Sequence, residues 1–418
     1  EWLTLRKSMR KDVLVYFAGK LIPAFVNLAV IVLAVRWLGE YGYGRYTLVF
    51  NAAILLSTLS IGWIQQGILR FLSAYPDERR LTVSRFFYLA VISSAGAVAA
   101  CLAVNLAYLR LPLAESLVVC VFVFLYNLLL FHLSLSQADR RSLHYATLEG
   151  TYNLLFLLLF AAIAFLAGYR HYDVLFISMA TALLVTELLR RTVLPSAPGD
   201  RDPYTVSFNP AFSGKVFRFG FPVTIWLFLS TLLTVLDRYI IGHYAGYDDV
   251  GAYSAVKDLI VKISTFTTIP VLLAFHPAIV ERWNEGRQSE AHALVRQGLR
   301  YCLVIAIAVM VLFIPARDLV FGRMLHLQIE SGLAVTVSLL LSSFLWQAAM
   351  LIHKPLELRL RPNLMLAAIL VALAVNASGN FLFIPRYGYT ASALAALASV
   401  VVYILVVLVF VAGLRHKK

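Results

Sequence analysis

Residues 219–262 read FGFPVTIWLFLSTLLTVLDRYIIGHYAGYDDVGAYSAVKDLIVK, and this stretch decides the fold class of the chain. Two long apolar runs within it hold five ionisable side chains, which are Asp237, Arg238, Lys257, Asp258 and Lys262. A charged side chain inside a membrane span costs about 2.5 to 3.5 kcal/mol on insertion scales. Such charges therefore indicate a functional, water-accessible path through a membrane protein.

The composition of the whole chain supports the same class. Of its 418 residues 61% are hydrophobic and 14% are charged, and the mean hydropathy is +0.81. Soluble domains are only about 45 to 50% apolar. Since a membrane span needs about 20 apolar residues, the sequence predicts an all-α polytopic membrane protein with twelve transmembrane helices. Their approximate ranges are 13–35, 44–66, 85–109, 115–136, 145–168, 173–193, 217–241, 250–275, 295–316, 330–352, 363–385 and 389–413.

The net charge of +14 is explained by where the basic residues lie. With the N-terminus in the cytoplasm, 25 of the 36 lysines and arginines fall in inner segments and seven in outer ones. This asymmetry is the positive-inside rule. It predicts a multi-pass protein of the cytoplasmic membrane with both termini in the cytoplasm, and it makes nucleic acid a poor candidate partner.

A short repeat predicts how the twelve helices are organised. The turn after the first predicted helix and the turn after the seventh both close on G-x-Y-[ST]-x-V, at residues 44–49 and 251–256. Six helices separate the copies, so the halves share one orientation, as in transporters with parallel repeats. We expect a six-helix lobe at residues 1–194, a Pro- and Gly-rich cytoplasmic linker at 195–214, and a second six-helix lobe at 215–418.

The first predicted helix carries a polar stripe. Lys20, Pro23 and Asn27 fall within about 60° of one another at 100° per residue. This face is a candidate cavity wall, although Lys20 could instead extend toward the inner headgroups. Pro23 is a candidate hinge, as are Gly220 and Pro222 at the start of the seventh helix.

The charges in the second half allow more than one pairing. Asp258 and Lys262 lie four residues apart on one helix, so they can pair locally. Lys257 points about 140° away from Lys262 and cannot easily share that pairing. Asp237 has its neighbour Arg238 as a possible partner. The three cysteines fall within predicted spans without metal-like spacing, so neither a metal site nor a disulfide framework is expected.

Three motifs in this order carry a family resemblance. They are an R-x-L-G…G-Y-G-x-Y turn at residues 36–46, an F-P…L-D-R-x-x-x-G span at 221–242, and an N-x-x-x-N…I-P-R-Y-G segment at 376–388. Together they resemble the polysaccharide, or Wzx-type, flippases of the multidrug/oligosaccharidyl-lipid/polysaccharide exporter superfamily. The resemblance implies a two-lobed, V-shaped transporter that moves an undecaprenyl-pyrophosphate-linked oligosaccharide from the inner to the outer leaflet. It also implies that a polysaccharide polymerase and chain-length machinery are possible partners.

The residues agree with an anionic lipid-linked substrate. Lys20, Arg238, Lys257 and Lys262 supply cations within spans, and Asn27 adds a polar group. We expect them to bind the pyrophosphate in a central cavity lined by helices 1, 2, 7 and 8, around which the halves rock. A multidrug exporter of cationic compounds is the alternative, which would call for unpaired carboxylates. A lipid II flippase is disfavoured because those proteins usually have fourteen spans.

An enzyme is also disfavoured. A membrane glycosyltransferase or polymerase would need a large outer loop with catalytic groups, whereas the predicted outer loops are short and hold neither a carboxylate pair nor a histidine cluster. The chain also lacks the G-x-x-x-x-G-K-[ST] motif of an ATP-binding loop. We therefore expect no cofactor, and transport driven by Na⁺, H⁺, the membrane potential or removal of the product.

A candidate site for a coupling ion lies in the second half. Asp237, Asn380 and Thr390 with Ser392 fall at one depth near the outer ends of their helices, at ~1.5 Å rise per residue, and Asn376 lies on the same helix face as Asn380. Carboxylate, amide and hydroxyl oxygens form a hard ligand set suited to Na⁺. Sodium-dependent members of the superfamily are similar in using helices 7, 11 and 12. The competing interpretation is that Asp237 pairs with Arg238 and the asparagines bond across helices.

Overall fold

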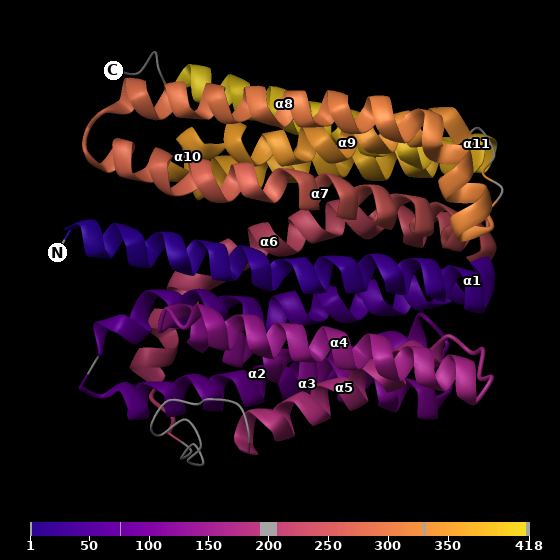
Figure 1. Ribbon diagram of the computed structural model, residues 1–418, viewed down its shortest axis with the longest axis horizontal. Helices are drawn as coiled ribbons and strands as arrows, with labels where there is room; N and C mark the ends of the chain where they lie inside the picture. Colours follow the sequence, from indigo (N-terminus) through magenta and orange to yellow (C-terminus); the bar gives the residue numbers. More distant parts are fainter. Residues whose placement is uncertain (1, 76, 193–206, 328, 330–331, 415–418) are drawn as a thin grey trace. The chain divides into compact units, whose positions relative to one another are not determined.

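The computed structural model describes residues 2–75, 77–192, 207–327, 329 and 332–414, with side chains from residue 22 onward. This part of the chain is almost entirely helical (Figure 1), which confirms the predicted all-α class. Most of the predicted linker 195–214 and the side chain of Lys20 lie outside the described residues. The end of that linker range belongs to a helix, because α6 begins at Pro210.

The elements follow in chain order as α1 (Trp2–Phe71), η1 (Leu72–Ala74), α2 (Arg79–Ala107), α3 (Leu113–Ala138), α4 (Ser142–Leu166), α5 (Asp173–Thr192), α6 (Pro210–Tyr244), α7 (Tyr247–Asn284), α8 (Gln288–Asp318), η2 (Leu319–Leu325), α9 (Gly332–Ile352), α10 (Lys354–Leu358) and α11 (Pro362–Gly413).

Nine helices within the described residues are long and apolar enough to cross a membrane, judged by length and composition. Two of them, α1 and α11, each contain one glycine with non-helical backbone angles, Gly39 (φ 71°) and Gly388 (φ 56°), so each comprises two helices. Positive φ values favour glycine because a Cβ clashes there. α5 is 20 residues long, which is also the length of a span. With α1 and α11 divided and α5 included, the description is consistent with twelve spans.

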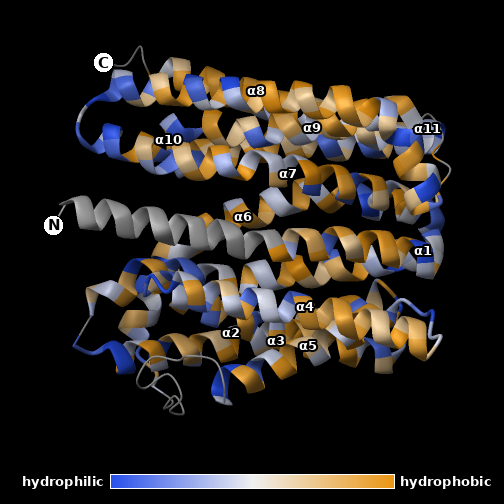
Figure 2. Ribbon diagram, in the orientation of Figure 1, coloured by the Kyte–Doolittle hydropathy of each residue, from blue (hydrophilic) through white to orange (hydrophobic). Residues whose placement is uncertain are grey.

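Apolar residues run along the lengths of these helices, and hydrophilic residues gather near their ends (Figure 2). Many large apolar side chains are exposed, among them Leu303, Ile307 and Val311 on α8. In water such surfaces would be a liability. In a bilayer they are the surfaces that face lipid, so the exposure pattern agrees with the membrane class.

The chain divides into two compact units. One comprises residues 1–30 and 48–228, and the other comprises 31–47 and 229–418. The division falls inside α1 and α6, so each of these helices contributes to both units. Residues 31–47, which the sequence assigns to the first lobe, belong to the second unit, and residues 215–228, assigned to the second lobe, belong to the first unit. The predicted lobe boundaries stay a prediction.

In the first unit, α3 packs against α2, α4 and α5. Polar side chains join these helices and α1, since the amide of Asn127 donates to the hydroxyls of Ser60 and Ser94 at 3.3 and 3.2 Å. Gln65 donates to Ser134 at 3.1 Å. Bonds of this kind hold helices together within a bilayer.

In the second unit, the two copies of the repeated turn pack against each other. A Cβ at Gly44 would overlap the carbonyl oxygen of Tyr247, and a Cβ at Gly251 would overlap that of Glu40. The hydroxyls of Thr47 and Ser254, at equivalent positions of the two copies, lie 3.4 Å apart. The contacts are reciprocal, because each glycine meets the carbonyl of the residue four positions before the other glycine. The repeat is therefore a structural pair, with small residues that allow close backbone approach.

Candidate functional site

Two crossed ion pairs join α6 to α7 in the second unit. Asp237 and Arg238 are consecutive on α6, and Lys257 and Asp258 are consecutive on α7. The Lys257 ammonium donates to Asp237 Oδ2, and the Arg238 guanidinium donates to both oxygens of Asp258, at 2.5 and 3.3 Å. The Asp237 side chain is fully buried, whereas Asp258 keeps 24% of its side chain exposed.

A tyrosine hydroxyl also donates a hydrogen bond to each of the two carboxylates. Tyr253 donates to Asp237 Oδ2 at 2.6 Å, and Tyr43 donates to Asp258 Oδ2 at 2.9 Å. The backbone N–H of Arg238 donates to Asp237 Oδ1 at 3.0 Å. A buried charge is tolerated only when it is paired and its remaining lone pairs accept hydrogen bonds. Asp237 meets both conditions.

These pairs differ from the local ones considered from the sequence. Consecutive residues on a helix point about 100° apart, so Asp237 and Arg238 each meet a partner on α7 and do not pair with each other. Asp258 has its oxygens occupied by Arg238 and Tyr43, so it does not pair with Lys262. The helix-to-helix contact replaces the expected i, i+4 contact.

Among the described candidate cations of the site, Lys262 is the one without a protein partner. Its side chain is exposed, and within the described part of the chain it has no ion pair or hydrogen bond. It lies one helical turn beyond Asp258 on the apolar helix α7. An unpaired ammonium in such a helix is expensive in hydrocarbon, which favours a water- or substrate-facing position.

A small cavity adjoins the buried pair, with a largely apolar surface and several polar side chains. It has a volume of about 60 Å³ and is lined in part by Lys257, Ser264, Ser342, Gln347 and Ser399. Each of the three serines donates its hydroxyl proton to a carbonyl of its own helix, so each oxygen keeps a lone pair that can accept, although Ser399 already accepts one bond from Asn376. This volume can hold a few water molecules. Water can therefore approach Lys257 from this side.

The predicted ion ligands separate into two groups. Asn380 donates to the side-chain oxygen of Asn376 at 3.0 Å and accepts from Ser392 at 2.7 Å. Asn376 donates to Ser399 at 3.3 Å. Thr390 is half-buried and takes no part in this chain of hydrogen bonds. Asp237 belongs instead to the Lys257 pair, and no described contact joins it to the asparagines.

The candidate hinges lie within continuous helix. Helix α1 passes through Pro23, and the amide of Asn27 donates to the Pro23 carbonyl at 2.6 Å. Helix α6 passes through Pro222. A Cβ at Gly220 would lie 2.9 Å from Cα of Trp63, so this glycine permits close packing. A hinge role at these positions stays a prediction.

Three participants were not predicted from the sequence, namely Tyr43, Tyr253 and Ser399, whereas Ser392 belonged to the predicted ion site. Tyr253 has a local signal, because it precedes Lys257 by one helical turn and its ring lies 5.4 Å from the ammonium. Tyr43 reaches Asp258 across 215 residues of chain. Such a contact leaves no trace in local spacing.

Comparison with known proteins identifies the family. The family described as "Polysaccharide biosynthesis protein" matches residues 9–283, more than half of the chain. This chain belongs to that family. The match ends within α7, so the third motif of the resemblance, at 376–388, lies beyond it. No curated protein matches the chain in sequence.

Solved structures with the same fold are membrane transporters. The lipid II flippase MurJ in an inward closed conformation is 12% identical, with a TM-score of 0.74 over 96% of this chain and 87% of that one. A MOP superfamily transporter from Pyrococcus furiosus is 12% identical, with a TM-score of 0.69 over 97% and 95%. An inward-facing multidrug resistance MATE transporter is 13% identical, with a TM-score of 0.70 over 97% and 99%. The polysaccharide biosynthesis family member thus has the MOP superfamily fold, and these similar proteins are transporters and flippases rather than enzymes.

Proposed function

We propose that this membrane transporter is a flippase that moves an undecaprenyl-pyrophosphate-linked oligosaccharide, such as an O-antigen repeat unit, from the inner to the outer leaflet. The family match carries the proposal, because it joins polysaccharide biosynthesis to a transporter fold. Alternating access of the two lobes would move the headgroup while the lipid tail stays in the bilayer.

The chemistry of the site supports an anionic cargo. A pyrophosphate carries negative charge across a low-dielectric layer, so its path should present cations. Lys262 is such a cation, exposed and unpaired among the described residues. Arg238 pairs with Asp258, which is partly exposed and lies one helical turn before Lys262 on α7.

The same geometry argues against export of cationic drugs. A cationic substrate would need a carboxylate free to receive it. Within the described site, Asp237 accepts from Lys257 and Asp258 accepts from Arg238, so both carboxylates are already neutralised. The fold alone would permit either function, and the charges favour the flippase.

The cellular setting follows from the charge asymmetry of the sequence. We propose a location in the cytoplasmic membrane with both termini in the cytoplasm, since inner segments hold most of the basic residues. A polysaccharide polymerase and chain-length machinery would act on the cargo at the outer face.

Reconstitution into vesicles tests this function. We expect the protein to expose a fluorescent polyprenyl-pyrophosphate-linked oligosaccharide to an impermeant quencher on the opposite side, and to leave a cationic dye such as ethidium untransported. Empty vesicles are the control. Ethidium transport without lipid movement would establish the exporter instead.

We propose further that H⁺, rather than Na⁺, acts at Asp237. Lys257 already supplies a cation to this carboxylate, and the Arg238 N–H and the Tyr253 hydroxyl also donate to it. Na⁺ would have to displace the ammonium, whereas a proton could reach the pair through water in the adjoining cavity. Na⁺ held by Asp237, Asn376, Asn380 and Thr390 is the alternative.

Ion replacement distinguishes the two cations. We expect lipid movement in vesicles to be unchanged when K⁺ replaces Na⁺, and to slow when a protonophore collapses the pH gradient. The Asn380→Ala variant should move the lipid at the unsubstituted rate, in Na⁺ and in K⁺ alike. Transport that stops without Na⁺ and is lost in Asn380→Ala would favour the sodium site.

A further inference from the structure

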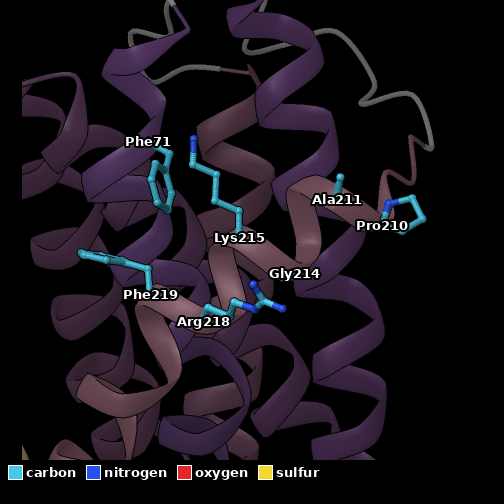
Figure 3. Close-up of a pocket in the computed structure, with 7 residues that line it drawn as sticks. All are labelled: Phe71, Pro210, Ala211, Gly214, Lys215, Arg218 and Phe219. Atoms are coloured by element: carbon cyan, nitrogen blue, oxygen red, sulfur yellow. The ribbon is translucent and has the colours of Figure 1, made fainter.

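A second candidate site lies in the first unit, away from the crossed ion pairs. Near the C-terminal end of α1 and the N-terminal end of α6, a pocket of about 650 Å³ is lined by seven residues, including Phe71, Gly214, Lys215, Arg218 and Phe219 (Figure 3). Lys215 extends beside Phe71, and Arg218 follows one helical turn further along α6. This end of the unit carries most of its basic residues, which the positive-inside rule assigns to the cytoplasmic surface.

Lys215 and Arg218 differ from several other basic residues at this end of the unit, which form ion pairs with carboxylates. Arg79 and Arg141 pair with Asp139, and Arg190 and Arg191 pair with Glu187, all at the same end of the unit. Lys215 and Arg218 have no carboxylate partner within the part of the chain that the structure describes. The pocket therefore concentrates positive charge that no carboxylate of the described residues compensates.

Aromatic rings fix the position of this charge. The Lys215 ammonium lies 4.8 Å from the centre of the Phe71 ring and donates to the Tyr75 hydroxyl at 3.1 Å. Phe71 and Phe219 meet edge to face, with ring centres 5.4 Å apart. A lysine held over an aromatic ring loses less conformational freedom when it binds an anion. The exposed Phe219 adds an apolar surface beside the charges.

We propose that this pocket binds the phosphate of a membrane lipid at the inner leaflet. Lys215 and Arg218 would pair with the phosphate oxygens, and Phe71 and Phe219 would contact the adjoining apolar part of the lipid. A basic pocket at the cytoplasmic membrane surface beside exposed aromatic side chains suits an amphiphile that carries a phosphate better than a free solute. The site does not depend on the proposed transport of an oligosaccharide, because binding is measured without transport.

Two lipids share this chemistry, namely an anionic phospholipid and a polyprenyl pyrophosphate. The experiment therefore titrates the purified full-length protein in phosphatidylcholine nanodiscs with dioctanoyl phosphatidylglycerol in one arm and farnesyl pyrophosphate in the other. Each cation near a membrane surface contributes about 1 kcal/mol, or about fivefold in affinity. We expect the Lys215→Gln/Arg218→Gln variant to bind about 30-fold more weakly in at least one arm.

Two further variants make the result specific. Gly214 lines the pocket, and a Cβ built on it meets nothing within 4 Å. Gly214→Leu should therefore fill the pocket and weaken binding while every charge remains. Arg70→Gln is the matched control, because Arg70 is an exposed cation one residue before Phe71 that does not line the pocket. Thermal unfolding of each variant confirms that it is folded.

The arms then identify the lipid. A loss for phosphatidylglycerol alone assigns the pocket to a phospholipid headgroup, a loss for farnesyl pyrophosphate alone assigns it to the carrier lipid, and a loss in both assigns it to either. Unchanged binding in both arms would overturn the proposal. An equal loss in Arg70→Gln would also overturn it, since surface charge in general would then explain the binding.

Discussion

Lys257→Met is expected to destabilise the protein by about 3 to 5 kcal/mol, because it leaves the fully buried Asp237 charge without its partner. The double variant Asp237→Asn/Lys257→Met should recover most of this loss, since the amide oxygen can accept from the Arg238 N–H while the amide NH2 donates to the Tyr253 hydroxyl. Unfolding of the purified protein, followed by circular dichroism over a denaturant series, measures both values.

The exposed pair Arg282–Glu285 is the matched control for this cycle. Its side chains keep 34% and 41% of their surface exposed, so Arg282→Gln should cost less than about 1 kcal/mol. Equal effects of Lys257→Met and Arg282→Gln would contradict the buried crossed pair, and so would a double variant no more stable than Lys257→Met alone.

Gly251→Ala is expected to cost more than about 3 kcal/mol or to prevent folding, because the added methyl group overlaps the carbonyl oxygen of Glu40. The clash is with backbone, so no side-chain rotation relieves it. Gly44→Ala should behave in the same way, since its methyl group overlaps the carbonyl oxygen of Tyr247. The yield of monodisperse protein in detergent and the unfolding midpoint are the measurements.

Gly96→Ala provides the comparison. Gly96 is exposed on α2, and a Cβ there meets nothing within 4 Å. Alanine is a better helix former than glycine by about 1 kcal/mol, so this variant should be as stable as the unsubstituted protein or more so. If Gly251→Ala and Gly96→Ala unfolded alike, the close packing of the repeated turns would be wrong.

Much of the fold was predictable because a membrane simplifies the physics. Every backbone group in the hydrocarbon must be satisfied within a helix, so apolar runs of sufficient length identify the elements directly. The predicted span 173–193 coincides with α5 at Asp173–Thr192. The helices themselves extend beyond the apolar runs, as α6 does toward Pro210, because helix formation continues outside the hydrocarbon.

The partners within the site were less predictable. The sequence placed Asp237, Arg238, Lys257 and Asp258 close together, but the rotation of α6 against α7 decides which acid meets which base. An error of one residue changes the direction of a side chain by about 100°. The hydrogen bond from Tyr43 to Asp258 also requires two distant segments to pack together, and Gly44 and Gly251 make this packing possible. Local spacing carries no information on either.

The most direct test of the central claim is lipid movement by the Lys262→Gln variant in vesicles. We expect Lys262→Gln to remain folded but to expose the polyprenyl-pyrophosphate-linked oligosaccharide much more slowly, and Lys262→Arg to retain most of the rate. The alternative is that Lys262 only neutralises Asp258. Since Arg238 already pairs with Asp258, that alternative predicts no loss of transport in Lys262→Gln. A Lys262→Gln protein that moves the lipid at the unsubstituted rate would contradict the account.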